Sequence, residues 1–236
     1  MNKLDKKEKG SKTAKDGFNN EKEISNKFNN FLDDTDAKDW LEGFGYLFSD
    51  IKSIKSEVIP NKLTKLYLNG KDIPIVQYDE LQTFKKADIL VQIELFSKIS
   101  IFTHKISCKK ADQSANYNQL DKRKVSKYKS FWDFDEDIKY GLELFTGEIK
   151  AEEIKSKRNN RLFMNEIPQF YIKRIFDFFD INKKVIISDI IRGRGFFAAD
   201  WMLVTRKVEN SQQYLLKNIH DVISFYSMGK VELTKR

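Results

Sequence analysis

The sequence predicts an α/β or α+β fold with one central mixed β-sheet flanked by helices. Apolar residues make up 40% of the 236 residues and include 19 Phe, which is enough for a sizeable core. Helical patterns precede, interrupt and follow a small set of apolar, strand-like runs. This order is typical of a sheet covered by helices. We expect a polar N-terminal arm over 1–10 and a single domain over 11–236.

The individual elements follow from apolar spacing and from turn residues. Asp34, Thr35 and Asp36 are helix-start residues, and Pro168 opens a later helix. Asn69–Gly70 separates two apolar runs and indicates a hairpin. A turn of two residues between two apolar runs predicts a second hairpin over 89–108. The expected helices cover 11–32, 37–48, 140–145, 168–179 and 215–226, and the expected strands 89–96, 99–108, 185–187 and 196–204.

The composition excludes several functional classes. One cysteine, Cys108, excludes an internal disulfide framework and a cysteine-based zinc site, and two histidines argue against a histidine-rich metal centre. The sequence has neither a long uncharged apolar stretch nor an apolar signal core near its start, so we expect a soluble, cytoplasmic protein. The net charge of +8 indicates an anionic partner, either nucleic acid or a membrane surface.

The hairpin over 89–108 brings chemically useful side chains together. Pairing across the turn at 97–98 places Asp88 opposite Ser107. Alternation then puts Thr103 and Lys105 on the same face as Asp88, with Lys105 as its diagonal neighbour. A carboxylate that holds a divalent metal beside an ammonium suits phosphodiester hydrolysis. The competing interpretation is an ordinary surface ion pair.

Several strings along the chain carry a further signal. They are GSKTAKDGF (10–18), NEKEI (20–24), NQLDK (118–122), FTGE (145–148) and SDIIRGRGFFAADWMLV (188–204). In this order they resemble small type II restriction endonucleases of the PD-(D/E)XK superfamily, in the HinP-type, GCGC-cutting branch related to MspI. The resemblance implies a restriction-endonuclease-like nuclease domain over 11–236 with an insertion at 60–84.

The resemblance also implies a catalytic set and Mg²⁺ as the cofactor. By the family pattern, Asp88 is the metal ligand and Lys105 the electrostatic catalyst. Thr103 takes the position where the branch carries Gln or Asn, and its hydroxyl is a shorter neutral ligand. Glu21 is expected to supply a second carboxylate to the metal. Its alternative is a solvated helix residue.

Base recognition is expected directly after the catalytic strand. By resemblance, Asn118, Gln119 and Lys122 meet base edges, and their amide and ammonium groups suit paired hydrogen bonds there. The alternative is a turn followed by a solvated basic helix. Lysines further along, at 124, 127 and 129, are expected to meet phosphates without sequence preference.

Two further segments are candidates for phosphate binding. Ser11, Lys12 and Thr13 are expected at a helix start, where backbone N–H groups bind anions, although simple N-capping is the alternative. Arg192 and Arg194 stand in an Arg-Gly-Arg-Gly run between two expected strands. Their glycines would allow close approach of DNA, and the alternative is a structural turn with two surface arginines.

The sequence therefore predicts a Mg²⁺-dependent type II restriction endonuclease that cuts double-stranded DNA at a short palindrome, by resemblance GCGC. We expect a cognate DNA methyltransferase encoded nearby, not as a bound subunit, and no membrane partner. A catalytically inactive DNA-binding relative is the alternative, favoured by Thr103 and by a C-terminal end that is short for the family. A methyltransferase is disfavoured because no glycine-rich cofactor loop follows an early strand.

Overall fold

The computed structural model describes residues 3–75, 78–111, 123–154, 161–209 and 211–232, with side chains from residue 16 onward. These residues form two compact units where the sequence predicts one domain. The first unit comprises 1–118 and 191–223, and the second comprises 119–190 and 224–236. Helix α1 (Lys3–Asn29) begins inside the segment that was expected to form a polar arm.

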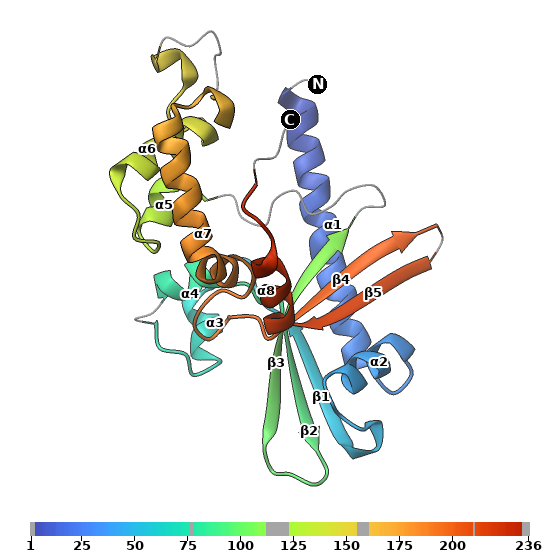
Figure 1. The fold of residues 1–236 in the computed structure, drawn as a ribbon. Helices are drawn as coiled ribbons and strands as arrows, with labels where there is room; N and C mark the ends of the chain where they lie inside the picture. Colours follow the sequence, from blue (N-terminus) through green and yellow to red (C-terminus); the bar gives the residue numbers. More distant parts are fainter. Residues whose placement is uncertain (1–2, 76–77, 112–122, 155–160, 210, 233–236) are drawn as a thin grey trace. The chain divides into compact units, whose positions relative to one another are not determined.

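The first unit contains a five-stranded sheet in the order β1-β2-β3-β4-β5 (Figure 1). The pairs β1–β2, β2–β3 and β4–β5 are antiparallel, whereas β3 and β4 are parallel. The sheet is therefore mixed and flanked by helices, as the sequence predicts. Its strands are β1 (Ile51–Val58), β2 (Ile89–Leu95), β3 (Ile101–Ala111), β4 (Trp201–Val208) and β5 (Ser211–Asn218).

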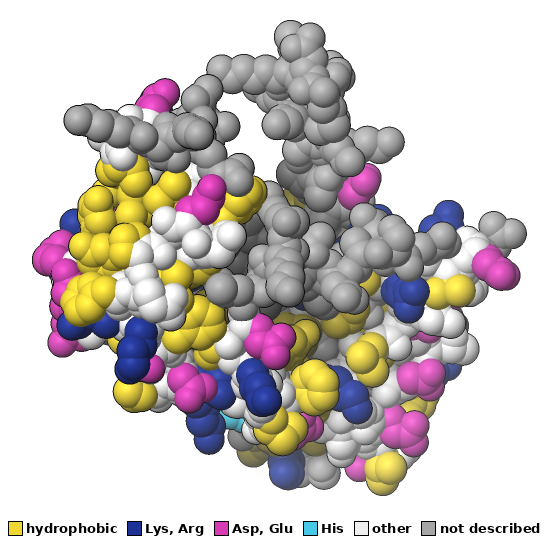
Figure 2. Space-filling model, turned by 45° about the horizontal axis from the view of Figure 1, so that its top comes forward, with side chains coloured by type: hydrophobic (Ala, Val, Ile, Leu, Met, Phe, Trp, Pro, Cys, Tyr) yellow, Lys and Arg dark blue, Asp and Glu magenta, His cyan; other side chains and the backbone are white. Residues whose placement is uncertain are grey.

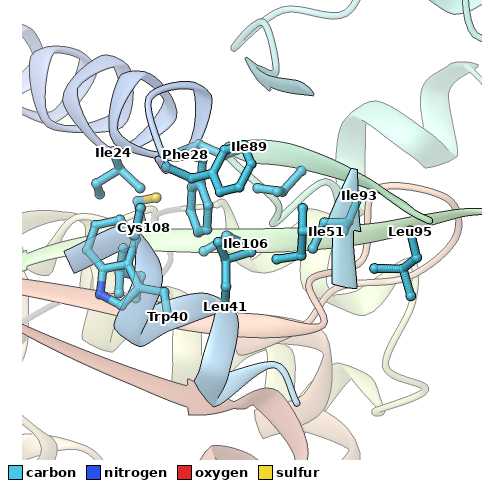
Figure 3. Close-up of a cluster of buried hydrophobic side chains, with 14 residues drawn as sticks. Ile24, Phe28, Trp40, Leu41, Ile51, Ile89, Ile93, Leu95, Ile106 and Cys108 are labelled. Carbon is cyan, nitrogen blue, oxygen red and sulfur yellow. The ribbon is translucent and has the colours of Figure 1, made fainter. Parts of the chain in front are cut away.

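The main core lies between this sheet and the helices α1 and α2 (Thr35–Gly43) (Figure 3). Ile24 and Phe28 of α1 are fully buried against apolar side chains of β2 and β3. The expected helix start at Asp34 is confirmed, because its carboxylate accepts the backbone N–H of Ala37 and caps α2. This core fixes α1 beside β2 and β3, which matters below because α1 carries Glu21.

Residues 60–84, expected as an insertion with a hairpin, fold as helices. Thr64 caps the short helix α3 (Lys65–Asn69), and Gly70 ends it, so the hairpin prediction at Asn69–Gly70 is wrong. Helix α4 (Tyr78–Phe84) follows. Together they form a second core with Leu90 of β2 and with Phe197. The segment is therefore an integral part of the sheet unit.

The second unit is helical and has its own core. It contains α5 (Val125–Lys129), α6 (Glu136–Thr146) and most of α7 (Gln169–Ile191). Buried residues of all three helices form one cluster, and the Trp132 indole donates a buried hydrogen bond of 2.9 Å to Asp189. The last helix is α8 (Ile219–Met228).

Three expected strand or helix boundaries are wrong. Residues 185–187, expected as a strand, lie inside α7, which runs on to Ile191. The strand expected from Phe196 begins at Trp201, and residues 215–218 belong to β5 instead of the final helix. The 3-10 turns η1 (Phe48–Asp50), η3 (Ala151–Ile154) and η4 (Met164–Glu166) complete the described elements.

Candidate active site

The candidate active site lies where β2 begins beside β3. Asp88 immediately precedes β2, and β3 continues past this point, so Cys108 has no backbone partner on β2 there. The Asp88 carboxylate takes that place: its Oδ2 accepts the backbone N–H of Cys108 at 2.8 Å. The Ser107 hydroxyl also donates to Oδ2, at 3.4 Å. Two groups of β3, the Cys108 backbone and the Ser107 side chain, thus hold this carboxylate in one orientation.

Lys109 completes this group. Its Nζ lies 3.7 Å from Asp88 Oδ2 and donates to Ser107 Oγ at 2.8 Å and to the Cys108 carbonyl at 3.1 Å. The side chains of Asp88 and Lys109 are 18% and 29% exposed, so the pair is shielded but accessible. The Ser107 hydroxyl is therefore hydrogen-bonded to both the Asp88 carboxylate and the Lys109 ammonium, which face each other at 3.7 Å.

The predicted register of β2 and β3 is confirmed, but the predicted partner of Asp88 is wrong. Ile89 pairs with Ile106, which continues to Asp88 opposite Ser107. Both Lys105 and Lys109 are then diagonal to Asp88 on one face. The bond from Cys108 N draws the carboxylate toward Lys109, whereas Lys105 Nζ lies 3.7 Å from Asp200 Oδ2.

The prediction for Thr103 is also wrong, because the register places it far from Asp88. Thr103 pairs with Gln92, well inside the hairpin. It is four residues from Ser107, which corresponds to about 13 Å along a strand. The neutral oxygen beside the Asp88 carboxylate is therefore the Ser107 hydroxyl. Ser107 and Lys109 follow from the same register that the sequence suggests, and comparing both diagonal positions would have found them.

Asp200 repeats the arrangement of Asp88 on the other side of β3. It precedes β4, its Oδ2 accepts the backbone N–H of Lys105 at 3.1 Å, and it faces the Lys105 ammonium. Each neighbour of β3 is thus preceded by an aspartate that bonds to β3. Sequence reasoning missed Asp200, because it stands in a segment that was expected to be a strand.

Glu21 of α1 lies within electrostatic range of Asp88. Burial, and after it the negative charge of Asp88, raise the pKa of Glu21 to about 7, and the positive charges of Lys85 and Lys109 lower it by less. Lys85 lies close to the same carboxylates, and its pKa is lowered by burial. The site therefore contains two carboxylates and two lysines, and Lys85 is a member that sequence reasoning missed.

The donor atoms of this site fit a hard divalent cation. Two carboxylates that repel each other, together with the Ser107 hydroxyl and the Cys108 carbonyl, are oxygen ligands of the kind that Mg²⁺ prefers. Burial raises the pKa of the Cys108 thiol, so a thiolate ligand is disfavoured. Within the described residues no three His, Cys, Asp or Glu side chains converge, so neutral oxygens and water would complete the shell.

The Arg192–Gly195 loop lies between α7 and β4, not between two strands as expected. The backbone N–H of Arg194 donates to the carbonyl of Phe84, and its guanidinium lies 4.5 Å from the Phe84 ring centroid. Phe84 ends α4, four residues before Asp88. The loop is therefore attached to the chain that leads into the candidate active site.

The other predicted DNA-binding residues lie on α1 or outside the described residues. Ser11, Lys12 and Thr13 lie within α1, which begins at Lys3, so the expected helix start at these residues is wrong. Their side chains, and all of Asn118, Gln119 and Lys122, lie outside the described residues. Their contacts with DNA remain predictions.

His104 points to the opposite face of β3 from Lys105, as expected. Its Nδ1 accepts the Trp201 indole N–H at 3.1 Å, its Nε2 is 2.8 Å from the Tyr46 hydroxyl, and its ring stacks on Phe44. Burial lowers the pKa of His104. These contacts make it part of the packing behind the site.

Basic and acidic side chains are interspersed on the face drawn in Figure 2. The charge of +8 is therefore not gathered there in one large patch. In the part of the chain that the structure describes, no helix is long and apolar enough to cross a membrane.

Comparison with known proteins identifies the family. The family model of the R.HinP1I restriction endonuclease matches residues 70–236, which include Asp88, Ser107 and Lys109. Among solved structures, the restriction endonuclease MspI in complex with its cognate DNA is similar, with a TM-score of 0.54 and 12% identity over 84% of this chain and 68% of that chain. No curated protein matches the sequence. The chain therefore belongs to the R.HinP1I restriction endonuclease family and is a site-specific DNA nuclease of type II.

Proposed function

We propose that this protein hydrolyses phosphodiester bonds in double-stranded DNA in a Mg²⁺-dependent reaction at a short palindrome, with GCGC as the expected site. The proposal rests above all on the group formed by Asp88, Ser107 and Lys109 at the start of β2. Glu21 supports it as a second carboxylate. Resemblance to the GCGC-cutting branch supports the choice of site.

The roles of the residues follow from their chemistry. Hydrolysis attaches a water oxygen to phosphorus and breaks one P–O ester bond, so negative charge increases on the phosphate and on the leaving oxygen. The Lys109 ammonium stabilises that charge and orients the attacking water. Ser107 Oγ and the Cys108 carbonyl both accept from Nζ, which places the ammonium beside the proposed cation ligands.

Asp88 and Glu21 would hold the cation, with Ser107 Oγ and the Cys108 carbonyl oxygen as neutral ligands. When bound, Mg²⁺ supplies stabilisation of the phosphate charge and a water of lowered pKa. Asp88 remains in place during the reaction because the backbone N–H of Cys108 binds its carboxylate independently of the cation.

The first test compares two lysines on one face of β3. Lys109→Ala is expected to lower the single-turnover cleavage rate of a GCGC duplex by about 100-fold or more, because one charge-stabilising donor is lost. Lys105→Ala removes the same charge near Asp200 and is expected to change the rate by less than about tenfold. Rapid-quench cleavage in Mg²⁺ measures the rates, and duplex titration in Ca²⁺ checks that both variants still bind. Full cleavage by Lys109→Ala would exclude Lys109 as the catalyst.

The same assays separate the enzyme from its catalytically inactive alternative. Plasmid DNA incubated with Mg²⁺ should give discrete fragments whose mapped ends define the site and the cut position. Sequence-specific binding without fragments would support the inactive relative.

Recognition is assigned to residues after β3 by resemblance. Gln119→Ala is expected to weaken the complex with a GCGC duplex by about 10-fold or more, while binding to a non-cognate duplex changes little, because base contacts carry specificity. Fluorescence anisotropy in Ca²⁺ measures both affinities. Equal losses on the two duplexes would instead assign Gln119 to phosphate contact. Asn118 and Lys122 are expected to behave like Gln119.

Arg192 and Arg194, together with Ser11, Lys12 and Thr13, are proposed to contact phosphates. We also expect the enzyme to act in the cytoplasm beside a methyltransferase that protects the host's own sites. A gene for that methyltransferase next to this one would support the assignment.

A further inference from the structure

We propose that the Arg192–Gly195 loop clamps the chain leading into Asp88, and that Gly193 is the residue whose missing side chain makes this clamp possible. The inference rests on the proposed function, because it assigns Gly193 a positioning role for the catalytic carboxylate. We refer to residues 84–87 as the approach segment.

Backbone hydrogen bonds connect the approach segment to the chain around the loop. The N–H of Arg194 donates to Phe84 O at 3.3 Å. In the other direction, the N–H groups of Lys86 and Ala87 both donate to Phe197 O, at 3.1 and 3.0 Å. The approach segment is thus hydrogen-bonded at both of its ends to the segment around the loop. Each of the two segments donates to carbonyl oxygens of the other.

The loop is itself closed around its glycines. Ala199 N donates to Arg192 O at 2.7 Å, and Ala198 N donates to Gly195 O at 3.1 Å. The Arg194 guanidinium covers the Phe84 ring at 4.5 Å, a distance suited to a cation–π interaction. The loop that contacts the approach segment is therefore held in shape by its own hydrogen bonds.

Gly193 marks the closest approach between the two chains. Its φ is +75°, and a Cβ at this position would lie 1.9 Å from Phe84 O and 2.8 Å from Lys86 Cγ. An atom cannot fit at 1.9 Å from a carbonyl oxygen, and that oxygen belongs to the backbone. Any side chain at 193 must consequently displace the approach segment or the loop.

Displacement of the approach segment would reach Asp88 through a short, buried connection. Ala87 is fully buried, and Asp88 N donates to Ile106 O at 2.8 Å at the start of β2. The hydrogen bond from Cys108 N then fixes the orientation of the Asp88 carboxylate. The loop thus determines where β2 begins and where its preceding carboxylate lies. The same contacts would fix the position of a phosphate bound by Arg192 or Arg194 relative to Asp88.

A matched pair of glycine substitutions tests the clamp. Gly193→Ala and Gly195→Ala place a methyl group at similar φ values, +75° and +70°, and so share the cost of a left-handed conformation. Only the first meets backbone, because a Cβ at Gly195 has its nearest contact at 3.4 Å, with Leu81 Cδ2. Gly195→Ala is therefore the control for strain in the loop.

Gly193→Ala is expected to slow single-turnover cleavage by about 100-fold, the effect of a shift of about 1 Å in a catalytic group. It should also weaken Mn²⁺ binding to the DNA-free enzyme, measured by electron paramagnetic resonance. The cleavage rates are compared with the enzyme in saturating excess over the duplex, so that a loss of phosphate contacts by Arg192 or Arg194 does not enter the comparison. The losses of rate and of Mn²⁺ affinity for Gly195→Ala should both be smaller than those for Gly193→Ala, the loss of rate by about tenfold or more.

Equal rates and equal Mn²⁺ affinities for the two variants would overturn the clamp, while cleavage by the wild type would leave the proposed function intact. If the wild type does not cleave, the proposed function fails, and the Mn²⁺ affinities of the two variants still decide the clamp.

If Gly193→Ala does not fold, native-state hydrogen exchange of the wild type decides instead. The amides of Lys86, Ala87 and Arg194 should then open together with one free energy. Protection factors that differ by more than about tenfold among these amides would contradict a shared clamp.

Discussion

At the residue scale, the two carboxylates of the candidate active site have different surroundings. Asp88 accepts the backbone N–H of Cys108 at 2.8 Å and lies 3.7 Å from the Lys109 ammonium. Glu21 is partly buried beside that negative charge, which raises its pKa to about 7. If Glu21 holds the proposed cation, a proton would compete with that cation near neutral pH.

This competition has a consequence for stability in metal-free buffer. The pKa of Glu21 is raised on folding, so its contribution to stability is fully present below its unfolded pKa of about 4.3 and is lost as the pH rises through about 7. Glu21→Gln is expected to raise the unfolding midpoint relative to the wild type at pH 8 and to have little effect at pH 4.5. Thermal unfolding with chelator measures the difference.

Glu23→Gln is the control for that experiment, because Glu23 lies on the same helix but is exposed. Glu23→Gln is expected to raise the unfolding midpoint at pH 8 by less than Glu21→Gln does. A larger gain for Glu21→Gln at pH 4.5 than at pH 8 would contradict the burial of Glu21 beside Asp88.

The limits of sequence reasoning at this scale are visible in the two lysines of β3. Strand alternation was sufficient to predict the face and the register, which place Lys105 and Lys109 equally far from Asp88 along the strand. The choice between them depends on the backbone N–H of Cys108, which has no backbone partner on β2 and binds the Asp88 carboxylate instead. Single-sequence patterns carry no information about such a tertiary hydrogen bond.

At the element scale, α3 provides a direct test of the segment at 60–84. Leu68 is fully buried in the core with Leu90, whereas Leu66, on the same helix, is 83% exposed. Leu68→Ala is expected to lower the free energy of unfolding by about 2–5 kcal/mol, because it leaves a cavity. Leu66→Ala should change it by about 0.5 kcal/mol or less. Urea denaturation measures both, and similar small effects would indicate that this segment is dispensable.

Element boundaries were predictable where capping residues, glycines or prolines mark the start or end of an element. Asp34 caps α2 as expected, and the long apolar runs of β2 and β3 identified the central hairpin. Residues 185–187 join α7 because no glycine or proline follows Pro168 until Gly193, so nothing ends the helix earlier. The outer strands β1 and β5 were missed because polar residues interrupt their apolar positions.

At the scale of the whole molecule, the charge of +8 bears on how DNA is bound. Basic and acidic side chains are interspersed on the visible face, so binding should depend on several separate phosphate contacts (Figure 2). With about six such contacts, affinity for a non-cognate duplex is expected to fall by about 1,000-fold between 50 and 200 mM salt. Anisotropy titrations in Ca²⁺ at four salt concentrations give the slope. An affinity that does not change with salt would argue against phosphate contacts.

The bond between the Asp88 carboxylate and Cys108 N affects how a non-cutting form of the enzyme should be made. Truncation to alanine would leave the backbone N–H of Cys108 without its acceptor and destabilise the fold there. The isosteric amide of asparagine keeps an acceptor oxygen while removing the charge. Asp88→Asn is therefore the better bait for isolating target duplexes from a genomic library.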